Sequence, residues 1–286
     1  MQSLLGVLFD GLAYGMLLFL LSAGLSVTLG MMNFVNLAHC AFAMVGGYAA
    51  VTLANQHGWP FLATLPAAFI AAAAASVVLE RTLYRRLYRA SELDQCLFTI
   101  GVVFISVAVA AYFFGTVQQS ASLPSWLRGS LHAMGINFAG YRVFLIVVGA
   151  AVTLLLVASL EYTRFGARVR AAVDNQRMAR GLGIDVDRAF AVTFALGGGL
   201  AGLGGALAIE IVGLDHQFAF TYLVYVLIVV AVGGLGSISG SLLAAVVLGI
   251  SDMAGKYYVP SLGAFLIYLV MVGLLMWRPA GLFGKR

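Results

Sequence analysis

Long apolar runs with few charges are the feature that most restricts what this chain can fold into. Hydrophobic residues make up 62% of its 286 residues, and charged residues make up 9%. A helix that crosses a bilayer needs about 20 apolar residues. Apolar runs, several of them shorter than this, cover residues 4–29, 35–54, 61–79, 95–114, 143–160, 189–212, 221–232, 241–254 and 262–277. They are apolar on every face, whereas β-barrel strands alternate. We therefore predict an all-α, multi-pass membrane bundle of about eight or nine transmembrane segments, some of them broken or re-entrant.

The rest of the chain leaves no room for a folded soluble domain, so residues 1–286 are predicted to form a single transmembrane domain. The net charge is +5, but the basic residues lie between apolar runs, which indicates a lipid bilayer as partner and no nucleic acid. Cys40 and Cys96 lie in or beside apolar runs. We expect no disulfide, metal or other cofactor.

The basic residues indicate how the chain is oriented. Thirteen of the 16 fall in three segments, at 80–92, 161–188 and 278–286. Cytoplasmic loops retain positive charge, and the number of predicted crossings between these segments is even. All three are therefore predicted to be cytoplasmic and the N-terminus external, although a re-entrant segment among the first three would reverse the position of the N-terminus.

The segment 161–188 is the only long polar stretch with a helical pattern. Val169, Ala172, Val173 and Ala179 lie near one face, and Asp174 is spaced to pair with Arg170 and Arg177. Gly181 and Gly183 then end the helix. This pattern predicts a short amphipathic helix parallel to the membrane. It is either a solvated loop that fixes topology or a docking element for a cytoplasmic partner; we favour docking, because topology requires no capped helix with an apolar stripe.

Two apolar runs are followed by an interruption of glycine and polar residues. The first, at 30–39, contains Asn33, Asn36 and His39, and the second, at 233–241, contains Ser237 and Ser239. Broken helices leave backbone amides unpaired, which a polar cavity tolerates and lipid does not. A pair of interruptions in corresponding halves points to a substrate path. An alternative of equal weight is that the glycines serve close packing and the polar side chains bond to neighbouring helices.

Other polar and glycine-rich features in the apolar runs have simpler explanations. Asp10 and Glu210 either line a translocation path or pair with another helix, whereas Asp252, at the end of a run, is expected to be solvated. Residues 197–205 contain a G-x-G-x-x-G pattern, but it lies inside an apolar run with no preceding strand. We interpret these glycines as helix-packing positions rather than a dinucleotide site.

Four blocks, in order along the chain, carry a resemblance to a known family. They are residues 30–39 with 41–48 (GMMNFVNLAH and AFAMVGGY), 170–184 (RAAVDNQRMARGLGI), 232–240 (VGGLGSISG) and 278–284 (RPAGLFG). The sequence resembles the inner-membrane permease subunit of ATP-binding-cassette importers of the high-affinity branched-chain amino acid type. The resemblance implies that a coupling helix within 164–184 contacts an ATPase subunit, and we assign this contact to Arg164, Arg168, Arg170, Asp174, Arg177 and Arg180.

The resemblance also implies the partners and the substrate class. It implies ATPase subunits, a second permease subunit, a periplasmic substrate-binding protein, and branched-chain amino acids or a similar small solute. The chain contains no G-x-x-x-x-G-K-[ST] motif, so we expect it to be a non-catalytic subunit. We assign the substrate path to Asn33, Asn36, His39, Glu210, Ser237 and Ser239. The alternative is a secondary transporter driven by protons or sodium through Asp10, Glu210 or His39.

Overall fold

The computed structural model describes residues 2–32, 34–88, 90–133 and 136–284. Within these residues, each predicted apolar stretch forms a helix, which confirms the all-α class. The helices are α1 (Gln2–Met32), α2 (His39–Asn55), α3 (Phe61–Thr82), α4 (Glu92–Phe114), α6 (Gly140–Glu161), α9 (Val186–Val212), α10 (Phe218–Gly233), α11 (Ile238–Tyr258) and α12 (Gly263–Trp277).

These helices differ in whether their length suits a membrane. Among the described residues, six are long and apolar enough to cross one: α1, α3, α4, α6, α9 and α11. Helix α10 and residues Phe265–Trp277 of α12 are apolar but shorter, and α2 has 17 residues. The chain is therefore a multi-pass membrane protein. Length and composition identify six crossings, fewer than the eight or nine predicted.

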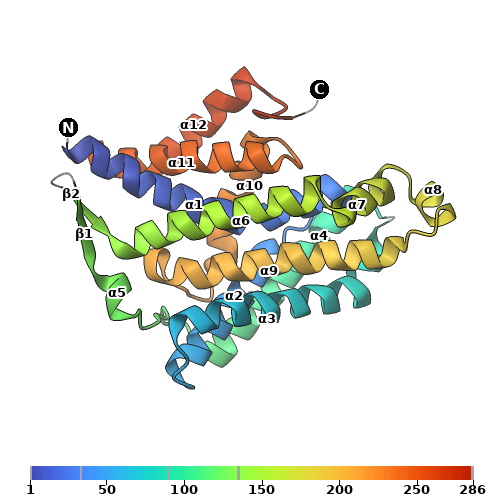
Figure 1. Ribbon diagram of the computed structural model, residues 1–286, viewed down its shortest axis with the longest axis horizontal. Coiled ribbons are helices and arrows are strands. Elements are labelled where there is room, and N and C mark those ends of the chain that lie inside the picture. Colours follow the sequence, from blue (N-terminus) through green and yellow to red (C-terminus); the bar gives the residue numbers. More distant parts are fainter. Residues whose placement is uncertain (1, 33, 89, 134–135, 285–286) are drawn as a thin grey trace.

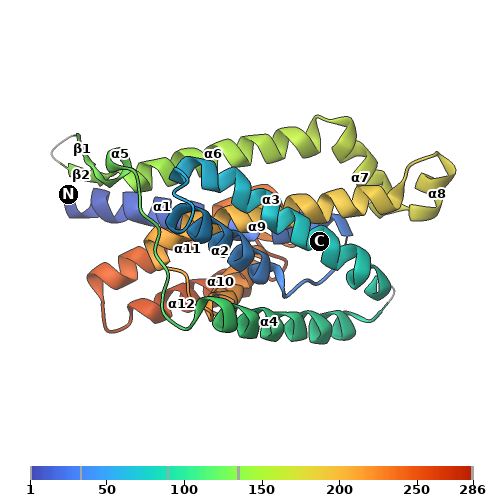
Figure 2. The ribbon, with the colours of Figure 1, turned by 90° about the horizontal axis from the view of Figure 1, so that it is seen from below.

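Short elements connect the long helices. They are the 3-10 helix η1 (Tyr84–Leu87), α5 (Ser125–Arg128), the antiparallel strands β1 (Ser130–Ala133) and β2 (Ile136–Ala139), α7 (Arg164–Asp174) and α8 (Gln176–Gly181). The hairpin was not predicted from the sequence, because its four-residue strands are too short to give a periodic signal. In Figures 1 and 2, α7 and α8 lie at one end of the molecule, and the N-terminus, α5 and the hairpin lie at the other.

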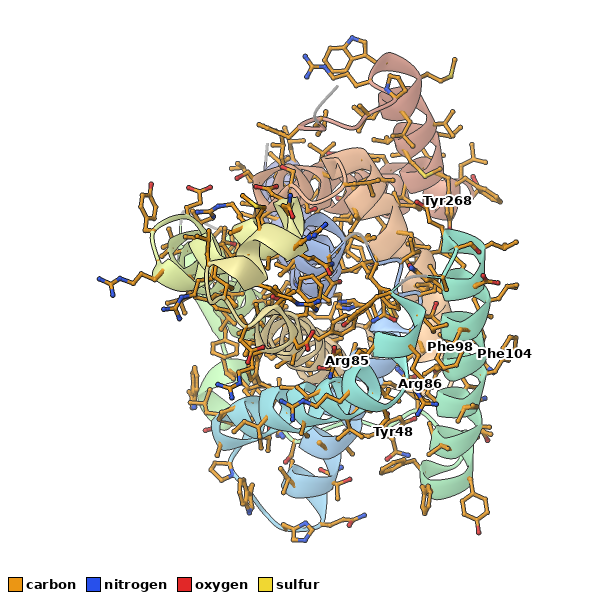
Figure 3. The ribbon with its side chains drawn as sticks, turned by 90° about the vertical axis from the view of Figure 1, so that its right-hand side faces the viewer. Tyr48, Arg85, Arg86, Phe98, Phe104 and Tyr268 are labelled. Atoms are coloured by element: carbon orange, nitrogen blue, oxygen red, sulfur yellow. The ribbon has the colours of Figure 1, made fainter. Side chains whose placement is uncertain are left out.

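The arginine-rich segments gather at the α7–α8 end, as the charge distribution predicts. Arg85 of η1 pairs with Asp187 at the start of α9. The C-terminal tail returns to the end of α10, where the Leu282 amide donates to the Val232 carbonyl at 2.8 Å. In the view onto this end, Arg85 and Arg86 lie close together on the connection between α3 and α4 (Figure 3).

Helix α9 packs against α1, α2 and α3 in the interior of the bundle. Its glycines allow the backbones to approach closely: a Cβ added to Gly46 of α2 would lie 2.3 Å from the Cα of Gly202, and one added to Gly24 of α1 would lie 2.1 Å from the Gly197 carbonyl oxygen. Small residues allow helices to pack this closely in lipid. The helix-packing interpretation of residues 197–205 is confirmed.

Candidate functional site

The first interruption of the helices, which we call the first break, comprises residues 34–38. Residues 34–36 have no regular secondary structure, and Leu37 and Ala38 form a turn. Helix α1 ends at Met32 and α2 begins at His39. The His39 Nε2 atom lies 3.0 Å from the carbonyl oxygen of Leu21, in the middle of α1. At 1.5 Å per residue, Leu21 is about 16 Å from the end of α1. The first break therefore runs back along α1 and starts α2 inside the bundle.

Side chains replace the missing helical hydrogen bonds of the first break. The Val35 amide donates to Gln95 Oε1 at 3.1 Å, and the Leu37 amide donates to Thr99 Oγ1 at 3.2 Å. Both acceptors belong to α4. The Ala38 amide donates to Asn36 Oδ1 at 3.1 Å. Irregular backbone survives at membrane depth when protein groups satisfy it, so α4 is required for this conformation.

The predicted path residues of the first break have structural roles in this conformation. Asn36 and His39 are each 1% exposed, and their described bonds go to the backbone of Ala38 and Leu21. Asn33 lies outside the described residues. For His39, this geometry agrees with the alternative in which the polar side chains of the interruption bond to a neighbouring helix.

The second interruption, which we call the second break, comprises Gly234–Ser237, between α10 and α11. Gly236 has a φ of +78°, and the Ser237 hydroxyl caps α11 by accepting from the Gly240 amide at 3.0 Å. A Cβ on Gly236 would lie 2.4 Å from the Cα of Gly30, near the end of α1. The Ser26 and Ser241 hydroxyls are 2.7 Å apart beside this contact. The end of α1, which precedes the first break, therefore touches the second break.

A cavity of about 600 Å³ lies beside this contact. It is bounded by the ends of α1 and α6, the second break and the C-terminal tail, with Gly30, Glu161, Ser237, Ser239 and Phe283 among its lining residues. Two of the predicted path residues, Ser237 and Ser239, thus meet in one hollow. Glu210 is exposed near the far end of α9, so the structure does not bring it to the same place.

The arginine-rich segment forms two helices instead of the single predicted one. Thr163 caps α7, and Asn175, in an extended conformation, caps α8 by accepting from the Met178 amide at 3.0 Å. The predicted apolar stripe is buried, with Val169 and Ala172 0% exposed. Gly183 has a φ of +81°, as expected for a helix-ending glycine.

The predicted pairing of Asp174 is wrong. In the described part of the chain, Asp174 forms no ion pair with Arg170 or Arg177. Arg170 donates to the Leu160 carbonyl at the end of α6. The extended backbone of Asn175 interrupts the helix between Asp174 and Arg177, so the three-residue spacing no longer places them on one face.

Apolar side chains lie among the exposed arginines of this segment. Arg164, Arg168 and Arg177 are exposed, and so are Met178 and Leu182, at 65% and 79%. Neither residue was among the predicted site residues, although an apolar residue outside the buried stripe of an amphipathic helix is a signal visible in the sequence. A surface that combines guanidinium groups with exposed apolar side chains suits a protein partner.

Two ion pairs lie toward the opposite end of the molecule. Asp10 of α1 pairs with Arg142 of α6. Of the two alternatives for Asp10, this is the one in which it pairs with another helix. Asp252 pairs with Lys256 at 2.6 Å and its side chain is 1% exposed, so the expectation that it is solvated was wrong. Their four-residue spacing on one helix was the available signal.

Comparison with known proteins identifies the family. Residues 7–275 match the family described as the branched-chain amino acid transport system permease component. The chain belongs to this family. It is 28% identical to the probable branched-chain amino acid transport permease protein LivH of Methanocaldococcus jannaschii, over 97% of this chain and 92% of that protein.

Two relatives in Escherichia coli K12 are also permeases of branched-chain amino acid transport. The high-affinity branched-chain amino acid transport system permease protein LivH is 24% identical, over 97% of this chain and 94% of that protein. The corresponding protein LivM is 26% identical, over 93% and 68%. The family match covers both breaks and the arginine-rich segment, so these features lie within the family domain.

Proposed function

We propose that this chain is the membrane-spanning permease subunit of an ATP-driven importer of branched-chain amino acids or a similar small aliphatic solute, located in the inner membrane. The observation that carries the proposal is the family match over residues 7–275. The exposed basic and apolar surface on α7 and α8 supports the proposal, because an ATP-driven permease needs a surface on which a cytoplasmic ATPase binds and transmits its conformational change.

The proposal includes nine crossings of the membrane. Helix α2 together with the first break, α10 and α12 would add three passes to the six membrane-length helices. This arrangement places the N-terminus outside and the arginine-rich end in the cytoplasm, in agreement with the positive-inside rule. Residues 1–286 would then be one transmembrane domain, and residues 161–188 its cytoplasmic coupling segment.

Partners follow from the same family. The permeases LivH and LivM of Escherichia coli both carry the name of a high-affinity branched-chain amino acid transport system, and this chain is similar to both. We infer a second permease subunit, ATPase subunits at Arg164, Arg168, Arg170, Asp174, Arg177 and Arg180, and a soluble binding protein on the outer face. The permease itself would be non-catalytic.

The inner part of the substrate path would run along the second break. Ser237 and Ser239 line the cavity with Glu161, whereas Asn36 and His39 support the first break from inside the bundle. Glu210 would lie at the outer mouth. Ion-coupled transport is disfavoured, because Asp10 is held by Arg142 and His39 by the backbone of Leu21.

Uptake in right-side-out vesicles tests this function. Vesicles holding the chain, a second permease and the ATPase, with ATP trapped inside, should accumulate radiolabelled leucine when the binding protein is supplied outside. A proton gradient without ATP should give no accumulation; accumulation by the chain alone under that gradient would refute the proposal.

A charge reversal tests the coupling surface. Arg177→Glu, on the exposed face of α8, should reduce ATP-dependent uptake at least tenfold without reducing the amount of inserted protein, because an ATPase surface complementary to arginine repels glutamate. Arg128→Glu is the matched control, since Arg128 is exposed at the opposite end. Equal uptake by the two variants would remove α8 from the proposal.

A further inference from the structure

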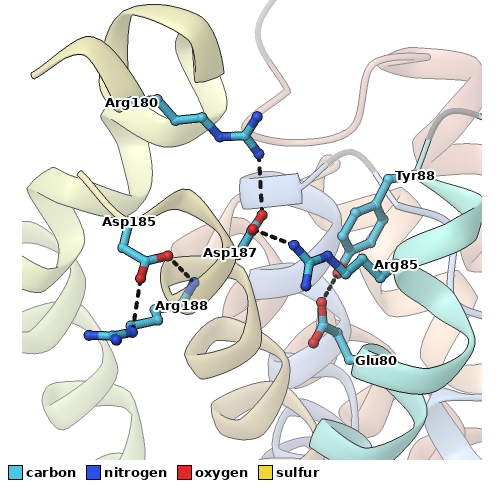
Figure 4. Close-up of polar contacts among 7 residues, drawn as sticks. All are labelled: Glu80, Arg85, Tyr88, Arg180, Asp185, Asp187 and Arg188. Atoms are coloured by element: carbon cyan, nitrogen blue, oxygen red, sulfur yellow. Dashed lines mark hydrogen bonds and ion pairs between the residues drawn. The ribbon is translucent and has the colours of Figure 1, made fainter. Parts of the chain in front are cut away.

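One carboxylate joins three separate pieces of the cytoplasmic end. Asp187, in the first turn of α9, accepts from Arg180 of α8, with Nη2 and Oδ1 3.2 Å apart. Its other oxygen pairs with Arg85 of η1, between α3 and α4. Figure 4 shows Asp187 between the two guanidinium groups. The coupling segment is thus tied to a different cytoplasmic connection through a single side chain.

The η1 connection continues into an aromatic cluster. Arg85 follows Tyr84, which is 0% exposed, and Tyr88 follows three residues later. The Phe34 ring lies 5.3 Å from that of Tyr84 and 5.6 Å from that of Tyr88, centre to centre. The Tyr88 hydroxyl donates to Glu80 at 2.7 Å. Burial and this hydrogen bond raise the pKa of Tyr88, so its hydroxyl remains a donor at neutral pH.

Phe34 is the first residue of the first break. The amides that follow it are held by the side chains of Gln95 and Thr99 instead of by a helical ladder. A segment held by side chains can change its position without unwinding a helix. The contacts therefore form a continuous series from α8 through Asp187, Arg85 and the tyrosines to the backbone that starts α2.

Exposure shows what the Asp187 pairs contribute. The side chains of Arg85, Arg180 and Asp187 are 46–55% exposed, and ion pairs this exposed add little to stability. Two arginines that share one carboxylate nevertheless fix the position of α8 relative to η1. A link that contributes little to stability but connects α8 with η1 is suited to transmitting a movement rather than to holding the fold.

We propose that Asp187 is a positioning residue that transmits movement of the coupling helix α8, through Arg85 and the Tyr84–Tyr88 cluster, to the first break. This proposal rests on the proposed function for its role in transport. The mechanical link itself, between α8 and residues 34–38, is a property of the chain alone and is measurable without transport.

Asp187→Asn removes the charge, and Asp185→Asn is the matched control. Asp185 pairs with Arg188, on the same helix turn, and caps α9 by accepting from the Arg188 amide at 3.0 Å. Asparagine caps as well as aspartate. Both variants lose one negative charge at the start of α9, but Asp187→Asn alone disconnects α8 from η1.

In reconstituted complexes, Asp187→Asn should reduce leucine transported per ATP hydrolysed three- to tenfold, while Asp185→Asn stays within twofold of the wild type. Arg85→Gln should lower the ratio too, and the double variant Arg85→Gln/Asp187→Asn should be no worse than Asp187→Asn, because both single substitutions break the same Arg85–Asp187 pair. Additive losses, or equal ratios in Asp187→Asn and Asp185→Asn, would overturn the proposal.

Hydrogen–deuterium exchange of the purified complex separates this inference from the proposed function. Asp187→Asn should accelerate amide exchange at least threefold in residues 34–38 as well as in α8, whereas Asp185→Asn should affect neither. Absence of ATP-dependent uptake in the wild type would refute the proposed function, but the exchange measurement would still test the link between α8 and residues 34–38, because it requires no transport. Unchanged exchange at residues 34–38 in Asp187→Asn would overturn the link even if the complex transports leucine.

Discussion

The two breaks share a pattern of glycine and polar residues between apolar helices, yet they satisfy their backbones differently. The first break is irregular and partly buried, and its Val35 and Leu37 amides depend on Gln95 and Thr99 of another helix. The second is a tight turn with a left-handed glycine and its own serine cap. The first is thus set by tertiary contacts and the second by local geometry. A turn set by local geometry, like the second break, keeps its conformation while a neighbouring cavity changes shape. A segment held by tertiary contacts, like the first break, moves with the helices that hold it.

The largest effect is expected at Gly236 of the second break, because this residue combines a left-handed backbone conformation with a close approach to Gly30 of α1. Gly236→Ala should lower the free energy of unfolding by about 2–4 kcal/mol, because alanine is strained at a φ of +78° and its Cβ would overlap Gly30. Unfolding in mixed micelles of increasing SDS content, followed by tryptophan fluorescence, measures the change.

Gly273→Ala is the control for this substitution. Gly273 lies in α12 with no neighbour within 4 Å of an added Cβ, so alanine there should be neutral or stabilise by about 0.5–1 kcal/mol. If both alanine variants unfold at the same SDS content, the close contact between Gly236 and the end of α1 is not significant.

The dependence of the first break on its neighbours is tested at Gln95, which is 4% exposed. Gln95→Leu should cost about 1–3 kcal/mol, since it leaves the part-buried Val35 amide without this acceptor. Gln118→Leu, at an exposed glutamine, should stay within about 0.5 kcal/mol of the wild type in the same titration. Equal costs would mean that α4 does not hold the first break.

The same division between local and tertiary effects explains what the sequence allowed us to predict. The apolar helices, both breaks, the capping glycine Gly183 and the packing role of the α9 glycines followed from composition and local pattern. The contact of Gly236 with Gly30, the pairing of Asp187 with Arg85 and the burial of Asp252 did not. Each of these depends on which helices become neighbours, and a pattern within one segment carries no information about that.

The candidate site shows the same limit. Ser237 and Ser239 were predicted as path residues from their glycine-rich context; they line the cavity together, and their role in a path stays a prediction. Asn36 and His39 have a similar context, but they are buried and bonded to backbone. The predicted pair of Asp174 with Arg177 failed because Asn175 is extended between them. The predicted pair with Arg170 failed because Arg170 donates to the Leu160 carbonyl instead, and the helical spacing revealed neither.

The smallest effect is expected at Ser237, where the second break supplies its own cap. Ser237→Ala should cost about 1 kcal/mol in the SDS titration, because the Gly240 amide loses its acceptor. Ser237→Asn should restore stability, since asparagine caps equally well, but leave leucine uptake below that of the wild type, because its longer side chain extends into the cavity. Full recovery of uptake in Ser237→Asn would limit Ser237 to capping, and Ser239 would remain as the serine whose hydroxyl is available to a solute in this cavity.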